Sequence, residues 1–197
     1  MKPTIASLQK ELRERKKEIK HLEQMVDYDD LTGLYNRRGF IKEANRFISQ
    51  IKNDMKLREE GFERRARIQN LSVIFLDLNK FKKINDTLGH EAGDTLLRQF
   101  GRFLLGSVRG TDMVTRWSGD EFVLALVGAQ KEEALMRARR LKERLKNKKF
   151  IVRKKSLSIS LSAGVASVFD PRHPVGLFDI EKLVDLADKE MYRDKKG

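Results

Sequence analysis

Hydrophobic residues in the first 27 positions follow the seven-residue repeat of a coiled coil. They recur at intervals of three, four or seven, Arg15 interrupts the repeat once, and the remaining positions are mostly charged or Gln. This pattern predicts a helix over residues 4–27 that pairs with a second copy, and the alternative is one amphipathic helix lying on the following domain. The predicted seam consists of Ile5, Leu8, Leu12, Ile19, Leu22 and Val26.

The pattern changes at residue 28 and predicts a second unit, an α/β domain over residues 28–197. A polar stretch over residues 40–69 has helical character and forms either one long helix or a helical hairpin. Two apolar runs flank a Gly-Asp turn, which predicts a β-hairpin and a sheet that is at least partly antiparallel. Strands are expected at 71–78, 113–117, 121–127, 149–154 and 157–168, and further helices at 80–88, 92–108, 131–147 and 180–194.

Composition narrows the chemistry that is available to this chain of 197 residues. Its 42 Lys and Arg exceed its 29 Asp and Glu, and the net charge of +13 favours an anionic partner: a nucleotide, a nucleic acid or a membrane surface. Cysteine is absent, which excludes disulfides, thiolate metal sites and thiol nucleophiles. Because no apolar run approaches the roughly 18 residues of a membrane span and the start does not resemble a secretory signal, we expect a cytoplasmic protein without membrane contact.

Acidic residues stand at the ends of predicted strands. Asp77 closes the first strand, and Asp120 and Glu121 occupy the hairpin tip. If these strands are neighbours, the carboxylates converge on one edge as oxygen ligands for Mg²⁺, and Gly119 lets a phosphate approach the backbone. The alternative is that these acids only cap turns.

Polar residues that follow the first strand can recognise a nucleotide. Asn85 can donate to and accept from a base edge, Asp94 can accept from the guanine N–H groups, and Lys82 can meet a phosphate. His90, taken alone, is better explained by a structural role.

Six blocks of the sequence, in order, resemble the signatures of the GGDEF family, the diguanylate cyclases. The most specific is Ser-Gly-Asp-Glu-Phe at residues 118–122, which differs from the family signature only in its first residue. The helix that precedes the first block resembles the signalling helix that often precedes such domains. The other blocks are residues 30–38, 77–86, 89–94, 162–166 and 187–192.

The resemblance implies a palm-like α/β (α+β) domain with a five-stranded, mostly antiparallel sheet flanked by helices. It implies a homodimer that condenses two GTP into cyclic di-3′,5′-GMP and releases two pyrophosphates, with Mg²⁺ as the cofactor and Mn²⁺ as an alternative ion. Asp77, the Leu78 carbonyl and Asp120 would hold the metal, and Asp120 with Glu121 would be catalytic. The implied substrate-binding residues are Phe81, Lys82, Asn85, His90, Asp94, Gly119 and Lys195.

A second implied site binds the product and inhibits the enzyme. Arg109 and Asp112 match the R-x-x-D inhibitory motif at the family's distance upstream of the hairpin. An Arg fork and a carboxylate together suit guanine and phosphate groups. Taken without its position, the same pattern is better explained by an Arg at a helix end followed by an Asp in a loop.

The sequence departs from the family at four places. Ser118 replaces a glycine, at a cost if the turn needs a positive φ, and Asn79 replaces an acid, for which we expect a small effect. The stretch before Asp77 is longer than usual, which predicts a helical insert at about 52–69. The segment after Lys195 is short, which puts triphosphate binding in question.

These departures keep two alternatives to an active diguanylate cyclase open. A catalytically weak or inactive GGDEF domain would bind GTP or cyclic di-GMP as a sensor. A basic nucleic-acid-binding protein is the remote alternative, because few aromatic residues accompany the basic ones and no stacking platform is evident. We therefore expect GTP and cyclic di-GMP, rather than nucleic acid, as partners.

Overall fold

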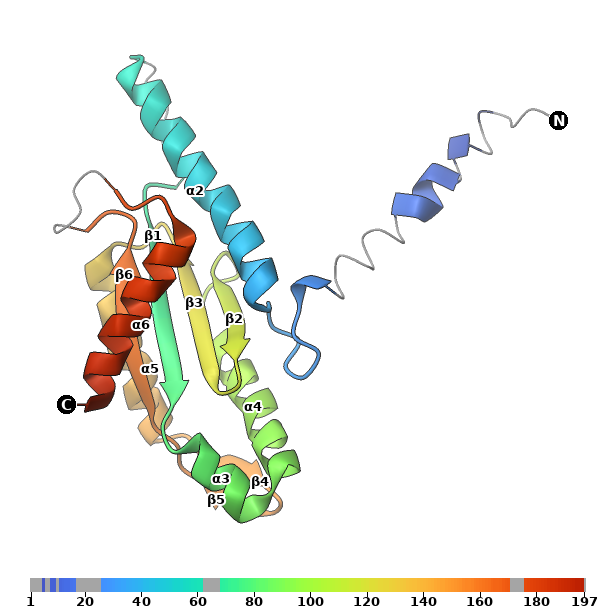
Figure 1. The fold of residues 1–197 in the computed structure, drawn as a ribbon, viewed down its shortest axis with the longest axis vertical. Helices are drawn as coiled ribbons and strands as arrows, with labels where there is room; N and C mark the ends of the chain where they lie inside the picture. Colours follow the sequence, from blue (N-terminus) through green and yellow to red (C-terminus); the bar gives the residue numbers. More distant parts are fainter. Residues whose placement is uncertain are drawn as a thin grey trace.

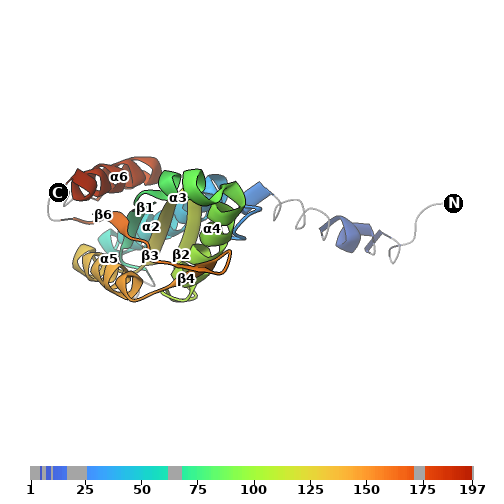
Figure 2. The ribbon, with the colours of Figure 1, turned by 90° about the horizontal axis from the view of Figure 1, so that it is seen from below.

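A four-stranded antiparallel sheet with helices on both faces forms the centre of the molecule (Figures 1 and 2). The computed structural model describes residues 5, 8–9, 11–16, 26–61, 68–170 and 176–196. The strand order is β2-β3-β1-β6, and β4 and β5 form a separate two-stranded hairpin. The strands are β1 (Leu71–Leu78), β2 (Met113–Ser118), β3 (Glu121–Val127), β4 (Phe150–Val152), β5 (Lys155–Leu157) and β6 (Leu161–Ser167).

Strand β1 lies between β3 and β6 and is buried along its whole length, as its apolar composition predicts. Successive side chains of a strand point to opposite faces, so β1 serves two cores. Ile74, Leu76 and Leu78 belong to the core beneath α4 (His90–Leu105) and α5 (Lys131–Lys146). Val73 and Phe75 belong to the core beneath α2 (Arg37–Glu59) and α6 (Ile180–Lys196). Asp77 continues this second series and therefore faces the α6 side.

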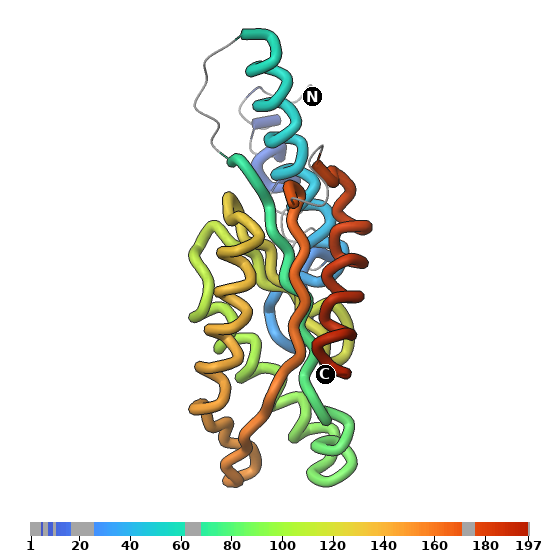
Figure 3. The backbone as a smooth tube through the Cα atoms, turned by 90° about the vertical axis from the view of Figure 1, so that its left-hand side faces the viewer, coloured from blue at the N-terminus to red at the C-terminus, as the bar shows by residue number. Residues whose placement is uncertain are grey.

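Helices α5 and α6 flank β6 from opposite sides (Figure 3). Gly164 of β6 makes the approach of α6 possible, because a Cβ there would come within 3.0 Å of the backbone of Ala187 and Met191. The short helix α3 (Phe81–Leu88) follows β1 and packs on α4. The C-terminal end of α6 lies near the C-terminal end of β1, after which α3 begins.

Helix α2 answers the question left open for residues 40–69 only as far as Glu59. It is one continuous helix to Glu59, and its N-cap Asn36 accepts a hydrogen bond from the Gly39 amide at 2.9 Å. Residues 52–59 of the predicted insert are thus an extension of α2, and residues 62–67 lie outside the described residues.

The prediction of five strands in the sheet is wrong for the described residues, while the palm-like antiparallel fold is confirmed. Beyond β2 only Tyr35 continues the sheet, through a single parallel bridge to Thr115. The next residue, Asn36, caps α2, so the chain turns into a helix before a fifth strand can form.

The predicted strand over 157–168 is also interrupted: residue 157 ends β5, and β6 begins only at Leu161. Arg153 and Lys154 adopt positive φ angles of 47° and 63°, which close the tight β4–β5 hairpin. Residues 158–160 then lead from this hairpin to β6 in the main sheet. The predicted helix 92–108 is shifted in the structure, because α4 begins at His90, directly after Gly89 at φ 83°, and ends at Leu105.

The predicted N-terminal seam is described only in part. Ile5, Leu8, Leu12 and Val26 are helical and exposed, whereas Ile19 and Leu22 lie outside the described residues. None of the helices in the described part of the chain has the length and apolar character of a membrane span.

Candidate functional site

Carboxylates from β1 and from the β2–β3 hairpin meet at one rim of the sheet. Asp77 stands directly opposite Glu121 in the antiparallel ladder, and the Leu78 amide donates to the Asp120 carbonyl at 3.3 Å. Asp77 is 7% exposed, so its carboxylate is held within the fold. The structure thus brings together the four predicted catalytic and metal-binding residues, which come as two adjacent pairs more than 40 positions apart in the sequence.

Lys195 reaches this rim from α6. Its ammonium group donates to Asp77 Oδ1 at 2.7 Å. The neighbouring Asp194 fixes the helix end, because its carboxylate accepts from Lys142 Nζ at 2.7 Å and from the Ala163 amide at 2.9 Å. The predicted phosphate-binding lysine is therefore positioned by contacts to both α5 and β6.

The charges of the rim act on one another. Burial is the largest cause that raises the pKa of Asp120 above its ordinary value of 3.8, and the negative charge of Asp77 raises it further. Its own backbone amide, Lys195 and Arg116 oppose that rise. The pKa of Lys195 is also raised, first by the hydrogen bond to Asp77 and then by the charges of Asp77, Asp120 and Glu121. The rim therefore carries excess negative potential, which a cation would relieve.

The raised pKa of Asp120 predicts how stability depends on pH. The folded state holds this proton more tightly than the unfolded state, so the protonated carboxyl stabilises the fold in acid, and that stability is lost as the pH rises from 3.8 through the folded pKa. Asp120→Asn cannot ionise. The melting temperature of Asp120→Asn minus that of the wild type should increase as the pH is raised from acid to neutral. A difference that stays constant across the pH series would contradict the raised pKa of Asp120.

The hairpin tip is tied to the segment that enters the domain. Arg116 Nε donates to the Gly119 carbonyl at 3.0 Å, and its guanidinium pairs with Asp29 at 3.1 Å. Asp29 also accepts from the Thr32 amide at 2.8 Å, which holds the entry turn together. Sequence reasoning did not identify Arg116 and Asp29 as partners, although each stands beside a recognised block.

Ser118 fits the tip without backbone strain. Among the described residues, the positive φ at the tip belongs to Gly119, at 35°, and Ser118 is not a positive-φ residue. The Ser118 hydroxyl donates to the Glu121 carboxylate. The expected cost of a serine in the signature is therefore absent, and its hydroxyl instead orients Glu121.

Asn79, which replaces an acid of the family motif, is bonded to β6 and to the segment before it. Its amide group donates to Ser160 Oγ at 3.2 Å and accepts from Ser162 Oγ at 2.9 Å. These bonds fasten the start of α3 to β6.

The predicted guanine-reading residues lie where α3 packs on α4. The Asn85 amide oxygen is buried without a hydrogen-bond partner among the described residues. A Cβ at Gly93 would come within 3.0 Å of this oxygen, so the glycine makes the space for Asn85, and Asp94 follows it on α4. A buried polar atom without a partner is costly unless a ligand supplies one. Lys82 and His90 are exposed on the same two helices.

The acidic rim also suits a magnesium ion bound together with substrate. Within the described ranges, no three carboxylate or imidazole groups gather to hold a metal ion by themselves. Mg²⁺ usually takes one or two carboxylates and completes its shell with water and phosphate oxygens, and Asp77 and Asp120 provide such a pair. The Leu78 backbone connects the two, because Leu78 follows Asp77 in the chain and its amide donates to the Asp120 carbonyl.

The predicted inhibitory residues line a different cavity, of about 200 Å³, between the end of β3 and α5. Asp112 accepts hydrogen bonds from the Arg109 amide at 2.9 Å and the Val127 amide at 3.2 Å. It therefore has a structural task as well. Arg137 and Glu133 of α5 complete the polar wall, and sequence reasoning did not identify them.

The antiparallel sheet, the hairpin signature and the acidic rim define a palm-like GGDEF-type domain. The family model described as "Diguanylate cyclase, GGDEF domain" matches residues 26–197, and the chain belongs to this family. Diguanylate cyclase DosC of Escherichia coli K12 is 35% identical over 194 residues, which cover 98% of this chain and 38% of that protein. The chain thus spans less than half of this curated relative.

Another curated relative carries a different name, and two solved structures share the fold. Cyclic di-GMP phosphodiesterase NbdA of Pseudomonas aeruginosa is 39% identical over 125 residues, which cover 64% of this chain and 14% of that protein. A sensory box/GGDEF family protein from Caulobacter crescentus superposes with a TM-score of 0.71 at 30% identity, covering 86% of this chain and 98% of the other. The coiled coil and GGDEF domain of DgcB from Caulobacter crescentus, solved with c-di-GMP, gives 0.76 at 20% identity, covering 98% and 93%.

Proposed function

We propose that this chain is a diguanylate cyclase that condenses two GTP into cyclic di-3′,5′-GMP and releases two pyrophosphates. The observation that carries the proposal is the acidic rim of Asp77 and Asp120, close to α3, where the Asn85 amide oxygen is buried with no hydrogen-bond partner in the described part of the chain. Such a pair of sites fits a purine triphosphate, with its phosphates at the rim and its base between α3 and α4. The name of the relative DosC supports the same activity.

The residues of the rim would have distinct tasks in this reaction. Asp77, Asp120 and the Leu78 carbonyl would hold Mg²⁺, which when bound offsets the phosphate charge and favours the ionised 3′-hydroxyl. Asp120 and Glu121 would stand beside that hydroxyl and accept its proton as its oxygen attacks the α-phosphorus of the other GTP. Pyrophosphate then leaves with the electron pair of the broken bond, and Lys195 would bind the phosphates.

The guanine base would bind between α3 and α4, whereas the phosphates would bind at the acidic rim. Asn85 and Asp94 would hydrogen-bond the guanine edge, while Phe81 packs beneath it and Gly119 admits the phosphates at the hairpin. Lys82 and His90, both exposed on the same helices, would contact the nucleotide from the solvent side.

Two copies of the domain are needed because each holds one GTP while the product joins two. The proposed division is a signalling helix over residues 1–27 and the cyclase domain over residues 28–197. The exposed apolar residues Ile5, Leu8, Leu12 and Val26 support pairing of this helix with its copy. The coiled coil solved with the GGDEF domain of DgcB supports the same arrangement, and a cytoplasmic location is part of the proposal.

Incubation of the purified protein with GTP and Mg²⁺ tests the function. We expect cyclic di-GMP and pyrophosphate in a one-to-two ratio, separated and quantified by chromatography. Binding of either nucleotide without turnover would favour the sensor alternative. Salt-dependent binding of DNA or RNA without either result would favour the nucleic-acid alternative.

Product inhibition is expected to depend on Arg109. Arg109→Ala removes the guanidinium fork from the cavity but leaves the Arg109 amide, to which Asp112 is bonded, in place. The inhibition constant for cyclic di-GMP should rise at least about tenfold, because a bidentate charged contact is lost. Initial rates at increasing product concentration measure this effect.

Arg139→Ala on the exposed face of α5 provides the control, since it removes the same charge outside the cavity. Equal inhibition of Arg109→Ala and the wild type would refute the inhibitory site. Asp112→Ala is a poorer test because it also removes two backbone hydrogen bonds.

A further inference from the structure

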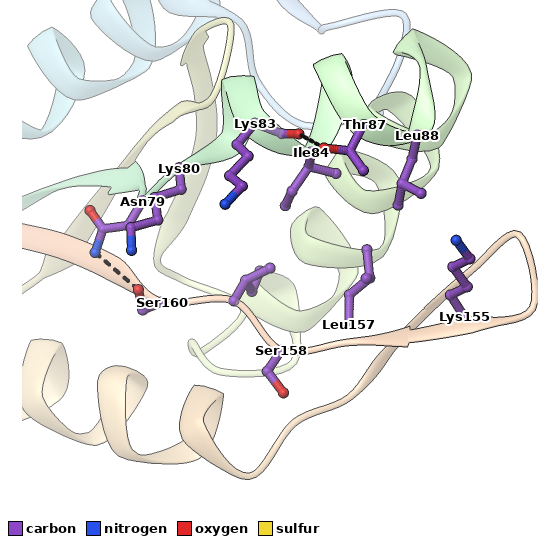
Figure 4. Close-up of a pocket in the computed structure, with 11 residues that line it drawn as sticks. Asn79, Lys80, Lys83, Ile84, Thr87, Leu88, Lys155, Leu157, Ser158 and Ser160 are labelled. Atoms are coloured by element: carbon purple, nitrogen blue, oxygen red, sulfur yellow. Dashed lines mark hydrogen bonds between the residues drawn. The ribbon is translucent and has the colours of Figure 1, made fainter.

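A cavity of about 410 Å³ lies between α3 and the chain that runs from β5 to β6. Figure 4 shows Ile84 and Leu88 pointing toward it from α3, and Leu157 from β5. Ile159, which is buried, completes the apolar lining. Cavities of roughly 300–1,000 Å³ with apolar walls are typical of small-molecule sites. The floor of this cavity is thus suited to the apolar body of a small ligand.

Three lysines surround this apolar floor. Lys80 and Lys83 come from the start of α3, and Lys155 comes from β5 on the opposite side (Figure 4). Their ammonium groups have no hydrogen-bond or ion-pair partner among the described residues, and no residue of the described lining carries a carboxylate. Positive charges without counter-charges attract anions, and a partly apolar wall strengthens their field.

The cavity is separate from the proposed guanine site. Residues 80, 83, 84, 87 and 88 are spaced three or four apart and share one stripe of α3, which faces the β4–β5 hairpin. Phe81 and Asn85 form a different stripe, which faces Gly93 of α4. A ligand in this cavity would therefore contact the side of α3 that the nucleotide leaves free.

We propose that this cavity is a second small-molecule site, which binds a ligand with an apolar body and one anionic group. The apolar body lies on Ile84, Leu88 and Leu157, and the anionic group, a carboxylate, sulfonate or phosphate, is bound by Lys83, at the same end of the cavity as Lys80 (Figure 4). This assignment does not depend on the cyclase activity, because it rests on the charge and lining of the cavity alone.

Fluorescence titration with anilinonaphthalenesulfonate tests the site. We expect saturable binding of one probe per domain, about tenfold tighter than binding of the uncharged analogue N-phenylnaphthylamine, which lacks the sulfonate. Lys83→Glu should weaken binding of the sulfonate about tenfold and leave binding of the uncharged analogue within about twofold. Lys182→Glu makes the same charge change at an exposed position on α6 and should alter neither.

Three results would overturn the proposal. Equal affinity for the two probes would show that the lysines do not recognise the anion, and unchanged sulfonate binding by Lys83→Glu would place the probe elsewhere. Displacement of the probe by GTP with Mg²⁺ would show that the cavity belongs to the nucleotide site. Circular dichroism of Lys83→Glu, whose side chain is exposed, verifies that the variant is folded.

Discussion

Replacing Asp120 with Asn is expected to lower the rate of cyclic di-GMP formation by at least about a thousandfold. The substitution keeps the size of the side chain and removes the charge that Asp120 contributes to the rim beside Asp77. A metal ion stabilises the charge of a transferring phosphate by several kcal/mol, and each 1.36 kcal/mol changes a rate about tenfold. The rate at saturating GTP and Mg²⁺, followed by chromatography, measures the loss.

Glu143→Gln is the matched control for this loss. Glu143 is an exposed carboxylate on α5, and its ion pair with Lys146 is equally exposed, so the variant should keep the wild-type rate. Retention of a tenth or more of the wild-type rate by Asp120→Asn would refute the metal-binding role of Asp120.

Gly164→Ala is expected to destabilise the fold by about 3 kcal/mol or to prevent folding. The added Cβ would approach the Ala187 carbonyl and the Met191 amide of α6 to within 3.0 Å. Backbone atoms in a packed helix cannot rotate away as a flexible side chain can, so α6 must move off β6. This movement would also withdraw Lys195 from Asp77. Urea unfolding followed by circular dichroism measures the free energy of unfolding.

Gly106→Ala serves as the comparison, because the nearest atoms to its Cβ would lie at 3.6 Å and its φ is −74°. We expect its free energy of unfolding to stay within about 0.5 kcal/mol of the wild type. Equal stability of Gly164→Ala and Gly106→Ala would contradict the close packing of α6 on β6.

The elements that the sequence predicted best are those with an unambiguous pattern. The expected strand 71–78 coincides with β1, because a continuous apolar and β-branched run is buried on both faces. The β2–β3 hairpin was equally clear, since a Gly-Asp turn separates two apolar runs. The turn between β4 and β5 was missed because it uses Arg153 and Lys154, which carry no turn signal despite their positive φ.

Parts of the candidate site were predictable for a different reason. Asp77 and Glu121 were recognised as acids at strand ends, whereas the pairing of β1 with β3, which makes them opposite neighbours, comes from the structure. The pairing of Lys195 with Asp77 and of Arg116 with Asp29 was not predicted. These partners are 118 and 87 positions apart, and no local pattern connects them.

The sequence by itself determined the order of helices and strands, the family blocks and the residue types available for binding a metal ion and a purine. Those features depend on short-range periodicity and on chemical identity, which are present in any stretch of the chain. Only the tertiary structure decided that Lys195 pairs with Asp77, that the Asn85 amide oxygen has no hydrogen-bond partner among the described residues, and that a cavity with lysines at its rim lies beside α3. These depend on how closely packed elements approach, as α6 does at Gly164, and such distances result from the packing of the whole domain.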